Sequence, residues 1–171
     1  MEKSYVQKNK FLIWLCLAEL GIITALCAIT HLYRVKDQKY DRSRYKDFRK
    51  KKLFNEWLYV YQRGMNIGKH ISDQGIRTAA IYGYTEVGER LADDLISAGI
   101  TINGIIDNKL DLCAPYKVFS SKEQLPDSDI CIVTVTDEFE DIKKQLSDKG
   151  VHNIQSLEDI IYEIRGKTDE L

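Results

Sequence analysis

The sequence predicts an α/β fold, in which a small doubly wound parallel sheet of about five strands follows a transmembrane helix and a basic amphipathic helix. Residues 11–33 form an apolar run of 23 positions that a single charge, Glu19, interrupts. After residue 77, short β-rich runs alternate with segments of helical periodicity. These observations divide the chain into a tail (1–10), a transmembrane helix (11–33), a basic juxtamembrane and amphipathic segment (34–76), an α/β domain (77–165) and a second tail (166–171).

The apolar run is long enough to cross a bilayer. At about 1.5 Å per residue, a helix of this length spans a hydrocarbon core of about 30 Å. Glu19 costs roughly 2.5–3.5 kcal/mol on insertion scales, which the surrounding apolar residues offset. Two interpretations of Glu19 stay open: a polar contact with a partner inside the membrane, or a protonated or snorkelling side chain. Small residues at positions 18, 21, 25 and 28 form one stripe, which suits a membrane-protein partner or a homo-oligomer.

The charges on either side of the run set its orientation. Residues 1–10 hold three Lys and one Glu, whereas residues 34–52 hold ten Lys or Arg and three Asp. The positive-inside rule then predicts a single-pass protein of the cell membrane with a cytoplasmic C-terminal domain. The alternative is a cleavable signal peptide, but the run is long for one and no small-x-small site follows it. The four cysteines form no CxxC pair, which agrees with reduced thiols.

The basic segment predicts one class of partner. Its Lys and Arg residues are interleaved with Tyr40, Tyr45 and Phe48, and they lie next to the predicted bilayer. Anionic lipid headgroups attract such a segment by about 1 kcal/mol per basic residue. The domain behind it is acidic and would repel phosphate backbones, so we expect lipid contact and no nucleic acid.

Two helices precede the domain. From Arg42 to Arg63 the chain has no Pro or Gly, and apolar residues recur at i, i+3, i+4 and i+7. This pattern predicts an amphipathic helix that packs on the domain through Phe54, Trp57, Leu58 and Tyr61. A second, short helix carries Ile67 and Ile71 and ends by Gly75.

The last 95 residues or so read as alternating strands and helices. One strand is expected to place Ile100, Ile102 and Ile106 on one face. A short helix is expected between the third and fourth strands. The pattern predicts a parallel sheet with strand order 3-2-1-4-5. The five predicted strands are 78–82, 100–107, 117–119, 130–136 and 151–154.

The first turn of the domain, IYGYTEVGERL, carries the candidate site. A dinucleotide fingerprint needs three glycines, and Gly83 and Gly88 fill the first and third places, whereas Thr85 stands in the second. Asp107 closes the next strand at a spacing that suits an acceptor for ribose hydroxyls. The predicted ligand-binding residues are Gly83, Tyr84, Thr85, Glu86, Val87, Gly88, Asp107, Asn108, Thr134, Thr136 and Asp137. The alternative stays open that the glycines serve only the turn and that Asp107 only caps it.

Two stretches, AAIYGYTEVGERLADDLISAGITINGIIDNK and KVFSSKEQLPDSDICIVTV, resemble the Rossmann-like modules of bacterial surface-polysaccharide biosynthesis proteins. These modules include the N-terminal domain of sugar acetyltransferases and the cofactor-type domain of membrane nucleotide-sugar dehydratases and epimerases. The resemblance covers roughly residues 55–165 and implies association with nucleotide sugars or NAD(P) and with envelope glycan assembly. In such modules the turn is usually Gly-rich, so Thr85 departs from the pattern.

No catalytic constellation is found. Short-chain epimerases and dehydratases use a Tyr with a Lys four positions later, and no Tyr of this chain has one. The histidines His31, His70 and His152 have no neighbouring Cys or His in the sequence that would suggest a metal site. Ser120 and Ser121 lack a GxSxG context, so no reaction is assigned.

Two functions from different classes are therefore compared. The first is a membrane-anchored cytoplasmic module that binds a nucleotide, nucleotide sugar or NAD-like ligand in envelope or capsular polysaccharide biosynthesis. The second is a non-catalytic scaffold with a degenerate ligand site that organises partner enzymes at the membrane. A weaker third alternative is a catalytic subunit that another chain completes.

Overall fold

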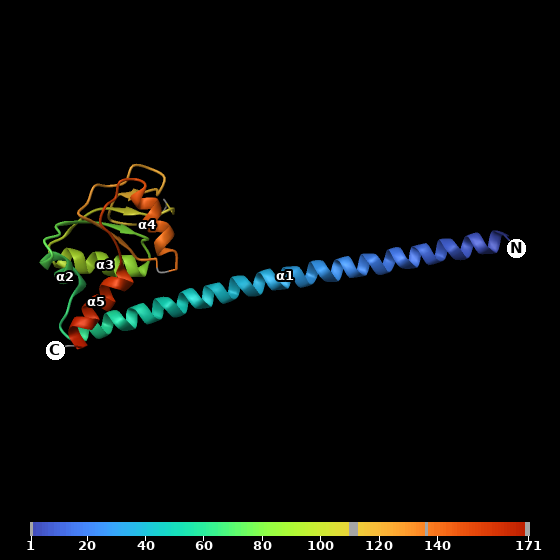
Figure 1. Ribbon diagram of the computed structural model, residues 1–171, viewed down its shortest axis with the longest axis horizontal. Helices are drawn as coiled ribbons and strands as arrows, with labels where there is room; N and C mark the ends of the chain where they lie inside the picture. Colours follow the sequence, from blue (N-terminus) through green and yellow to red (C-terminus); the bar gives the residue numbers. More distant parts are fainter. Residues whose placement is uncertain (1, 110–112, 136, 170–171) are drawn as a thin grey trace. The chain divides into compact units, whose positions relative to one another are not determined.

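A computed structural model of the chain describes the backbone of residues 2–109, 113–135 and 137–169, and the side chains of residues 20–22, 24–109, 113–135 and 137–167. The chain divides into two compact units, Met1–Asp47 and Phe48–Leu171. All described residues of the first unit are helical, since α1 extends over Glu2–Gln62 (Figure 1). Among the described residues, no helix is both long enough and apolar enough to span a membrane. The side chains of 11–19, Glu19 included, lie outside the described residues, so the predicted span stays a prediction.

The second unit is an α/β domain. After the end of α1, its helices are α2 (Ile67–Asp73), α3 (Glu86–Ser97), α4 (Phe139–Ser147) and α5 (Leu157–Asp169). Its strands are β1 (Thr78–Tyr82), β2 (Thr101–Ile106), β3 (Val118–Phe119), β4 (Ile130–Val133) and β5 (Ile154–Ser156).

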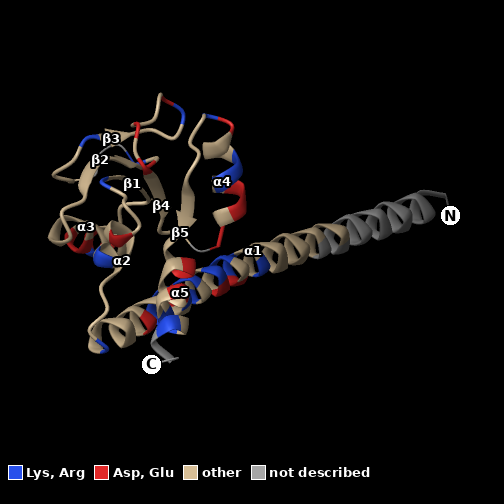
Figure 2. Cartoon of the chain, turned by 60° about the vertical axis from the view of Figure 1, so that its left-hand side comes forward, with Lys and Arg blue, Asp and Glu red and all other residues tan. Residues whose placement is uncertain are grey.

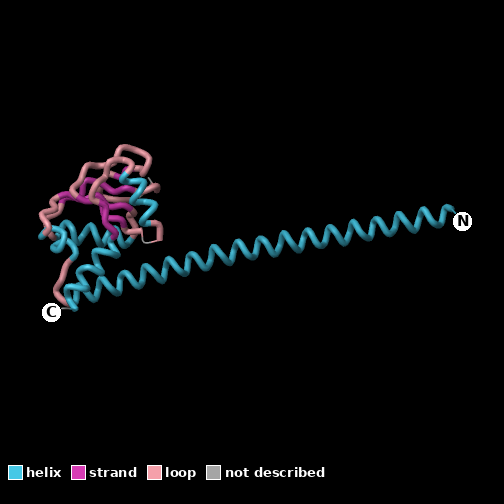
Figure 3. The backbone as a smooth tube through the Cα atoms, in the orientation of Figure 1, coloured by secondary structure: helices cyan, strands magenta, loops and turns pink. Residues whose placement is uncertain are grey.

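The five strands form one sheet in the order β3-β2-β1-β4-β5, and each neighbouring pair is parallel. Figure 2 labels the strands in this order, and Figure 3 shows them in magenta among the helices of the domain. This is the predicted order, and the Rossmann-like α/β prediction is confirmed at this level. The order reverses at β1, because β2 and β3 lie on one side of it and β4 and β5 on the other. Ligands of open α/β sheets bind at the carboxyl ends of the strands at such a reversal.

Helices cover the two faces of the sheet unequally. On one face, α2, α3, α5 and the last turns of α1 bury their apolar residues against Ala79 and Ile81 of β1. On the other face, α4 packs Ile142 and Leu146 against Tyr82 and neighbouring strand residues. All four residues of β4 are buried, as expected for a strand that is covered on both sides.

A register shift in β2 corrects the predicted face of its isoleucines. Ala79 pairs with Ile102, but the next residue, Ala80, pairs with Gly104, so that one extra residue, Asn103, stands in β2. An extra residue reverses the alternation of side chains beyond it. Ile100 and Ile102 therefore pack on the helix-rich face, while Ile106 packs on the α4 face.

Two further expectations about the second half of the sheet are wrong. The last strand begins at Ile154 rather than Val151, because the N–H of Val151 bonds to the carbonyl of Leu146 and completes the end of α4. The short helix expected between β3 and β4 is absent from the described part of that segment, where a turn at Ser120–Glu123 is followed by extended chain.

The end of α1 packs on the domain through a face that differs from the predicted one. Leu53, Trp57 and Val60 are buried, whereas Leu58 and Tyr61 expose 52% and 62% of their surface. The spacing of four and then three residues between the buried positions is that of a helix stripe. The amphipathic helix is therefore confirmed, but its buried stripe is rotated from the predicted one.

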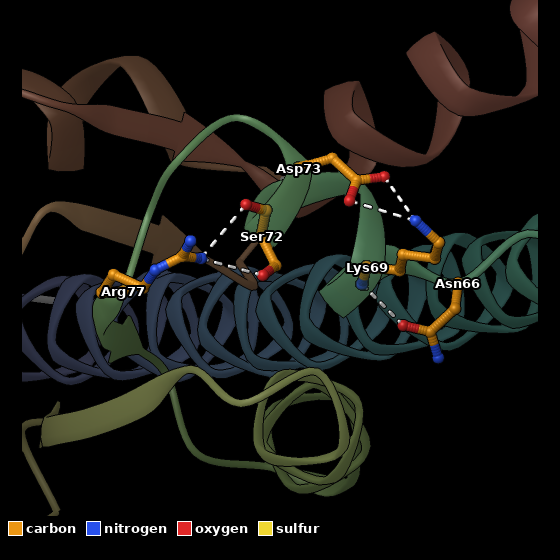
Figure 4. Close-up of polar contacts among 5 residues, drawn as sticks. All are labelled: Asn66, Lys69, Ser72, Asp73 and Arg77. Carbon is orange, nitrogen blue, oxygen red and sulfur yellow. Dashed lines mark hydrogen bonds and ion pairs between the residues drawn. The ribbon is translucent and has the colours of Figure 1, made fainter.

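Polar contacts fix α2 at both ends (Figure 4). The side chain of Asn66 accepts a hydrogen bond from the N–H of Lys69, as an N-cap residue does. Lys69 forms an ion pair with Asp73 one turn later, and the guanidinium of Arg77 donates to the carbonyl and hydroxyl oxygens of Ser72. These contacts hold α2 against the start of β1.

Candidate ligand-binding turn

Gly83 makes the tight turn that follows β1. Its φ is +87°, a left-handed conformation that residues with a β-carbon rarely adopt. A β-carbon there would also lie 2.8 Å from Oγ1 of Thr134. The N–H of Gly83 donates to the carbonyl of Ile106 at 2.9 Å, which ties the turn to the end of β2. This position therefore requires glycine, as the fingerprint predicts.

Gly88 lets α3 approach the same turn. A β-carbon on Gly88 would lie 2.5 Å from the carbonyl oxygen of Gly83, closer than real β-carbon contacts come. The third glycine of a dinucleotide fingerprint has this packing role. Both glycines are thus explained by the turn and by helix packing, whether or not a ligand binds.

Asp107 lies across the turn, at the carboxyl end of β2. Its Oδ2 accepts a hydrogen bond from the N–H of Tyr84 at 3.0 Å, and its Oδ1 accepts one from the N–H of Lys109 at 2.9 Å. Two backbone N–H groups therefore fix the orientation of the carboxylate. A carboxylate has about four acceptor positions, so the half-buried Asp107 retains capacity for ligand hydroxyls.

Thr134 reaches the turn from the end of β4. Its hydroxyl lies 2.8 Å from the carbonyl oxygen of Gly83 and 3.1 Å from that of Tyr82, so one hydrogen is shared between two acceptors. Thr134 is 8% exposed. Thr134 therefore stabilises the turn, and its hydroxyl hydrogen is already bonded to the backbone rather than available to a ligand.

The start of α3 is acidic. Thr85 is the exposed N-cap residue, but its side chain makes no capping hydrogen bond. Glu86 and Glu89 stand in the first turn, where carboxylates interact favourably with the helix dipole. Lys50 of α1 forms a close ion pair with Glu86, and the hydrogen bond from Lys50 lowers the pKa of this carboxyl group. A phosphate at this end of α3 would meet two carboxylates, of which Lys50 neutralises one.

Two predicted site residues turn their side chains into the core. Val87 is 4% exposed and Tyr84 is 8% exposed, and the Tyr84 ring packs edge-on against Tyr116 at 6.2 Å between ring centroids. Burial raises the pKa of the Tyr84 hydroxyl. Neither side chain is therefore exposed for contact with a ligand, and the N–H of Tyr84 already donates to Asp107.

The remaining predicted residues lie around the same edge of the sheet. Asn108 is exposed, and its Oδ1 accepts a hydrogen bond from the buried hydroxyl of Ser121 at 2.7 Å. Asp137 lines a different hollow, of about 350 Å³, between the starts of α4 and α5, with Glu140 and Asp159 among its other acidic residues. Thr136 lies outside the described residues.

Sequence reasoning missed two contributors to this region, Lys50 and Tyr116. Lys50 precedes Trp57 by two helical turns, and Trp57 donates to Asp94 of α3, so the end of α1 runs along α3. Helical spacing predicted that Lys50 and Trp57 lie on one helix, but no sequence signal indicated that this helix packs beside α3. No group of three or more His, Cys, Asp or Glu within the described segments is arranged to hold a metal ion.

No model of a protein family matches the chain, and no curated protein matches it. Among solved structures, the chain resembles the protein in a crystal structure of RSP in complex with β-NAD⁺ and operator DNA. The two are 18% identical, with a TM-score of 0.37, over 47% of this chain and 43% of that chain. This chain therefore spans less than half of the length of that neighbour.

Proposed function

We propose that the α/β domain binds a nucleotide-type ligand at the turn between β1 and α3. The observation that carries this proposal is the position of Asp107, whose carboxylate two backbone N–H groups hold at the carboxyl edge of the sheet, beside the reversal of strand order. A carboxylate fixed there is suited to accept hydrogen bonds from the hydroxyls of a ribose.

The charges of the site favour one group of nucleotides. Asp107 would repel a 2′-phosphate, so NAD or a nucleoside diphosphate sugar fits better than NADP. Thr85 and the carboxylates of Glu86 and Glu89 weaken the helix terminus as a pyrophosphate site. We therefore expect modest affinity, with the ribose contributing more than the phosphates. The resemblance to polysaccharide modules supports a nucleotide sugar in envelope glycan assembly.

We also propose that α1 anchors the chain in the cell membrane, with the domain on the cytoplasmic side. Five large apolar side chains of α1 each expose at least 48% of their surface in the single chain. A bilayer would cover them. They are Leu20, Ile22, Leu26, Ile29 and Leu32.

A scaffold function is the second candidate, and one observation favours it. The groups that would meet a ligand in a dinucleotide site are bonded within the chain: the N–H of Tyr84 to Asp107, and the hydroxyl of Thr134 to Gly83 and Tyr82. Such a turn is stable without a ligand, and the domain would then serve only to hold partner enzymes.

Calorimetry on the full chain in detergent micelles separates the two candidates. The titrants are NAD, NADP, uridine diphosphate sugars and uridine monophosphate. The binding proposal predicts measurable heat with NAD or a uridine diphosphate sugar and weaker binding of NADP. Absence of heat with all four titrants would leave the scaffold function.

A pair of variants tests the role of Asp107. Asp107→Asn removes the charge and leaves one acceptor oxygen, so the side chain can accept from only one of the N–H groups of Tyr84 and Lys109. We expect it to weaken ligand binding about tenfold or more. Asp148→Asn removes an exposed carboxylate at the end of α4, and it should bind as the unmodified chain does. Equal affinities for the two variants would exclude Asp107 from the site.

A further inference from the structure

Residues 34–47 of α1 are exposed throughout. They include six basic residues and three aspartates, together with Tyr40 and Tyr45, which expose 64% and 55% of their surface. The guanidinium of Arg44 lies over the Tyr40 ring, 5.8 Å from its centroid. The side chains of this segment are therefore exposed to solvent, and Figure 2 shows its Lys and Arg residues in blue and its Asp residues in red along α1.

The basic side chains surround the helix axis. Each residue of an α-helix is rotated by roughly 100° from the one before it. Five of the basic residues consequently point in five directions, with gaps of about 60–80° between neighbours, so no side of the helix lacks a positive charge. They are Arg34, Lys36, Lys39, Arg42 and Arg44, and we call them the basic collar. The sixth basic residue, Lys46, lies between Arg42 and Lys39, whereas Asp37 and Asp41 lie between Arg44 and Arg34, where the net positive charge is lowest.

This arrangement disfavours two other uses of the segment. A helix that lies flat on a membrane gathers its apolar residues on one side and its charges on the other, which the collar does not do. The segment could also form a parallel coiled coil with a second copy, through the heptad repeat of Leu26, Tyr33 and Tyr40. That pairing would place Lys39 of one copy opposite Arg44 of the other. These like charges would repel.

We propose that the basic collar binds anionic lipid headgroups on all sides of a helix that stands upright in the bilayer surface. The proposal rests on the membrane anchoring proposed above. Tyr40 and Tyr45 fit the same location, because aromatic rings with a polar group concentrate at the membrane interface. Each basic residue near an anionic surface contributes a factor of about five in affinity.

Proteolysis of the full chain in vesicles tests the collar. An aspartate-specific endoproteinase cuts beside Asp37, Asp41 and Asp47, so its sites survive when basic residues are replaced. Vesicles of phosphatidylcholine alone are compared with vesicles containing roughly 30% phosphatidylglycerol. We expect cleavage to be at least about fivefold slower in the anionic vesicles, and each of the five single Gln variants of the collar to lose a similar part of this protection. Lys143→Gln, on α4, is the matched control and should retain it.

Other outcomes would contradict the proposed role of the basic collar, and they can be told apart from a failure of membrane anchoring. If the chain floats with both kinds of vesicle but is cleaved equally fast in both, anchoring holds and the collar is wrong. If only the Lys39→Gln and Arg42→Gln variants lose protection from cleavage in the anionic vesicles, the helix lies flat on the membrane through one face. If duplex DNA protects the segment better than anionic vesicles do, its partner is nucleic acid. A chain that floats with neither vesicle contradicts the anchoring itself.

Discussion

The carbonyl oxygen of Gly83 lies against Gly88, so closely that a β-carbon on Gly88 would be 2.5 Å from that oxygen. The oxygen belongs to the backbone of the turn, and the β-carbon would be attached directly to the backbone of α3, so neither atom could move away without shifting the main chain. We expect Gly88→Ala to lower the free energy of unfolding by about 1–3 kcal/mol, the usual cost of overpacking. Urea unfolding followed by tryptophan fluorescence measures this loss.

Gly166 provides the matched control for this substitution. It lies in α5, and a β-carbon there would meet no atom within 4 Å. Gly166→Ala should therefore raise the free energy of unfolding by about 0.5–1 kcal/mol, because alanine is the better helix former. Two alanine variants of equal stability would show that Gly88 is not a packing contact.

Thr85→Gly should improve the candidate site. It restores the second glycine of the fingerprint, which allows a pyrophosphate to approach the backbone. Because the Thr85 side chain makes no capping bond, the change costs only a few tenths of a kcal/mol in stability. We expect at least about threefold tighter binding of NAD or a nucleotide sugar by calorimetry, and no comparable gain for a nucleoside monophosphate.

Thr85→Ser is the control for that gain. Serine keeps both the β-carbon and the hydroxyl, so it should bind as threonine does. If glycine and serine give the same affinity at position 85, the pyrophosphate does not approach this part of the turn.

Local sequence signals predicted much of this domain. The bounds of β1, Thr78–Tyr82, agree with those expected, because a β-branched start and a sharp glycine turn mark both ends. The strand order also follows, since this alternation of strands and helices is typical of a doubly wound sheet, whose order reverses at the first strand. Gly83 and Gly88 were found because backbone geometry demands glycine at both positions.

Features that depend on tertiary contacts could not be predicted in this way. The extra residue at Asn103 is fixed by pairing with β1, and nothing in the order of residues in β2 marks it. The burial of Tyr84 depends on Tyr116, which is distant in sequence, and the bond from Tyr84 to Asp107 depends on how the turn closes. The spacing of apolar residues predicts which face of a helix or strand is buried, but not which neighbouring element covers that face.

Asp94 makes the stability of the domain depend on pH. Burial against α1 raises the pKa of its carboxyl group above the ordinary value of 3.8, while hydrogen bonds from Trp57 and Asn66 partly oppose this shift. As pH rises, the unfolded chain therefore releases this proton before the folded chain does. The contribution of Asp94 favours folding below the unfolded-state pKa and is lost as pH rises through the folded-state pKa.

Asp94→Asn tests this dependence, because the amide cannot ionise and its oxygen can still accept from Trp57. We expect the stability of the variant, relative to the unmodified chain, to increase between about pH 3 and pH 7. Urea unfolding at several pH values provides the measurement. Asp93→Asn controls for the loss of one charge on α3, at a side chain that is 72% exposed. A stability difference for Asp94→Asn that is constant with pH would contradict the prediction.

Cys131 should resist thiol reagents for as long as the domain stays folded. It lies in β4 at 1% exposure, and burial raises the pKa of its thiol to about 12. Because the thiolate is the reactive form, both protonation and burial protect it. Exposed Cys113 is the internal control. Mass spectrometry after iodoacetamide treatment at neutral pH should find Cys113 modified and Cys131 intact, and both modified in urea. Equal labelling of the two thiols in the native protein would mean that β4 is open to solvent.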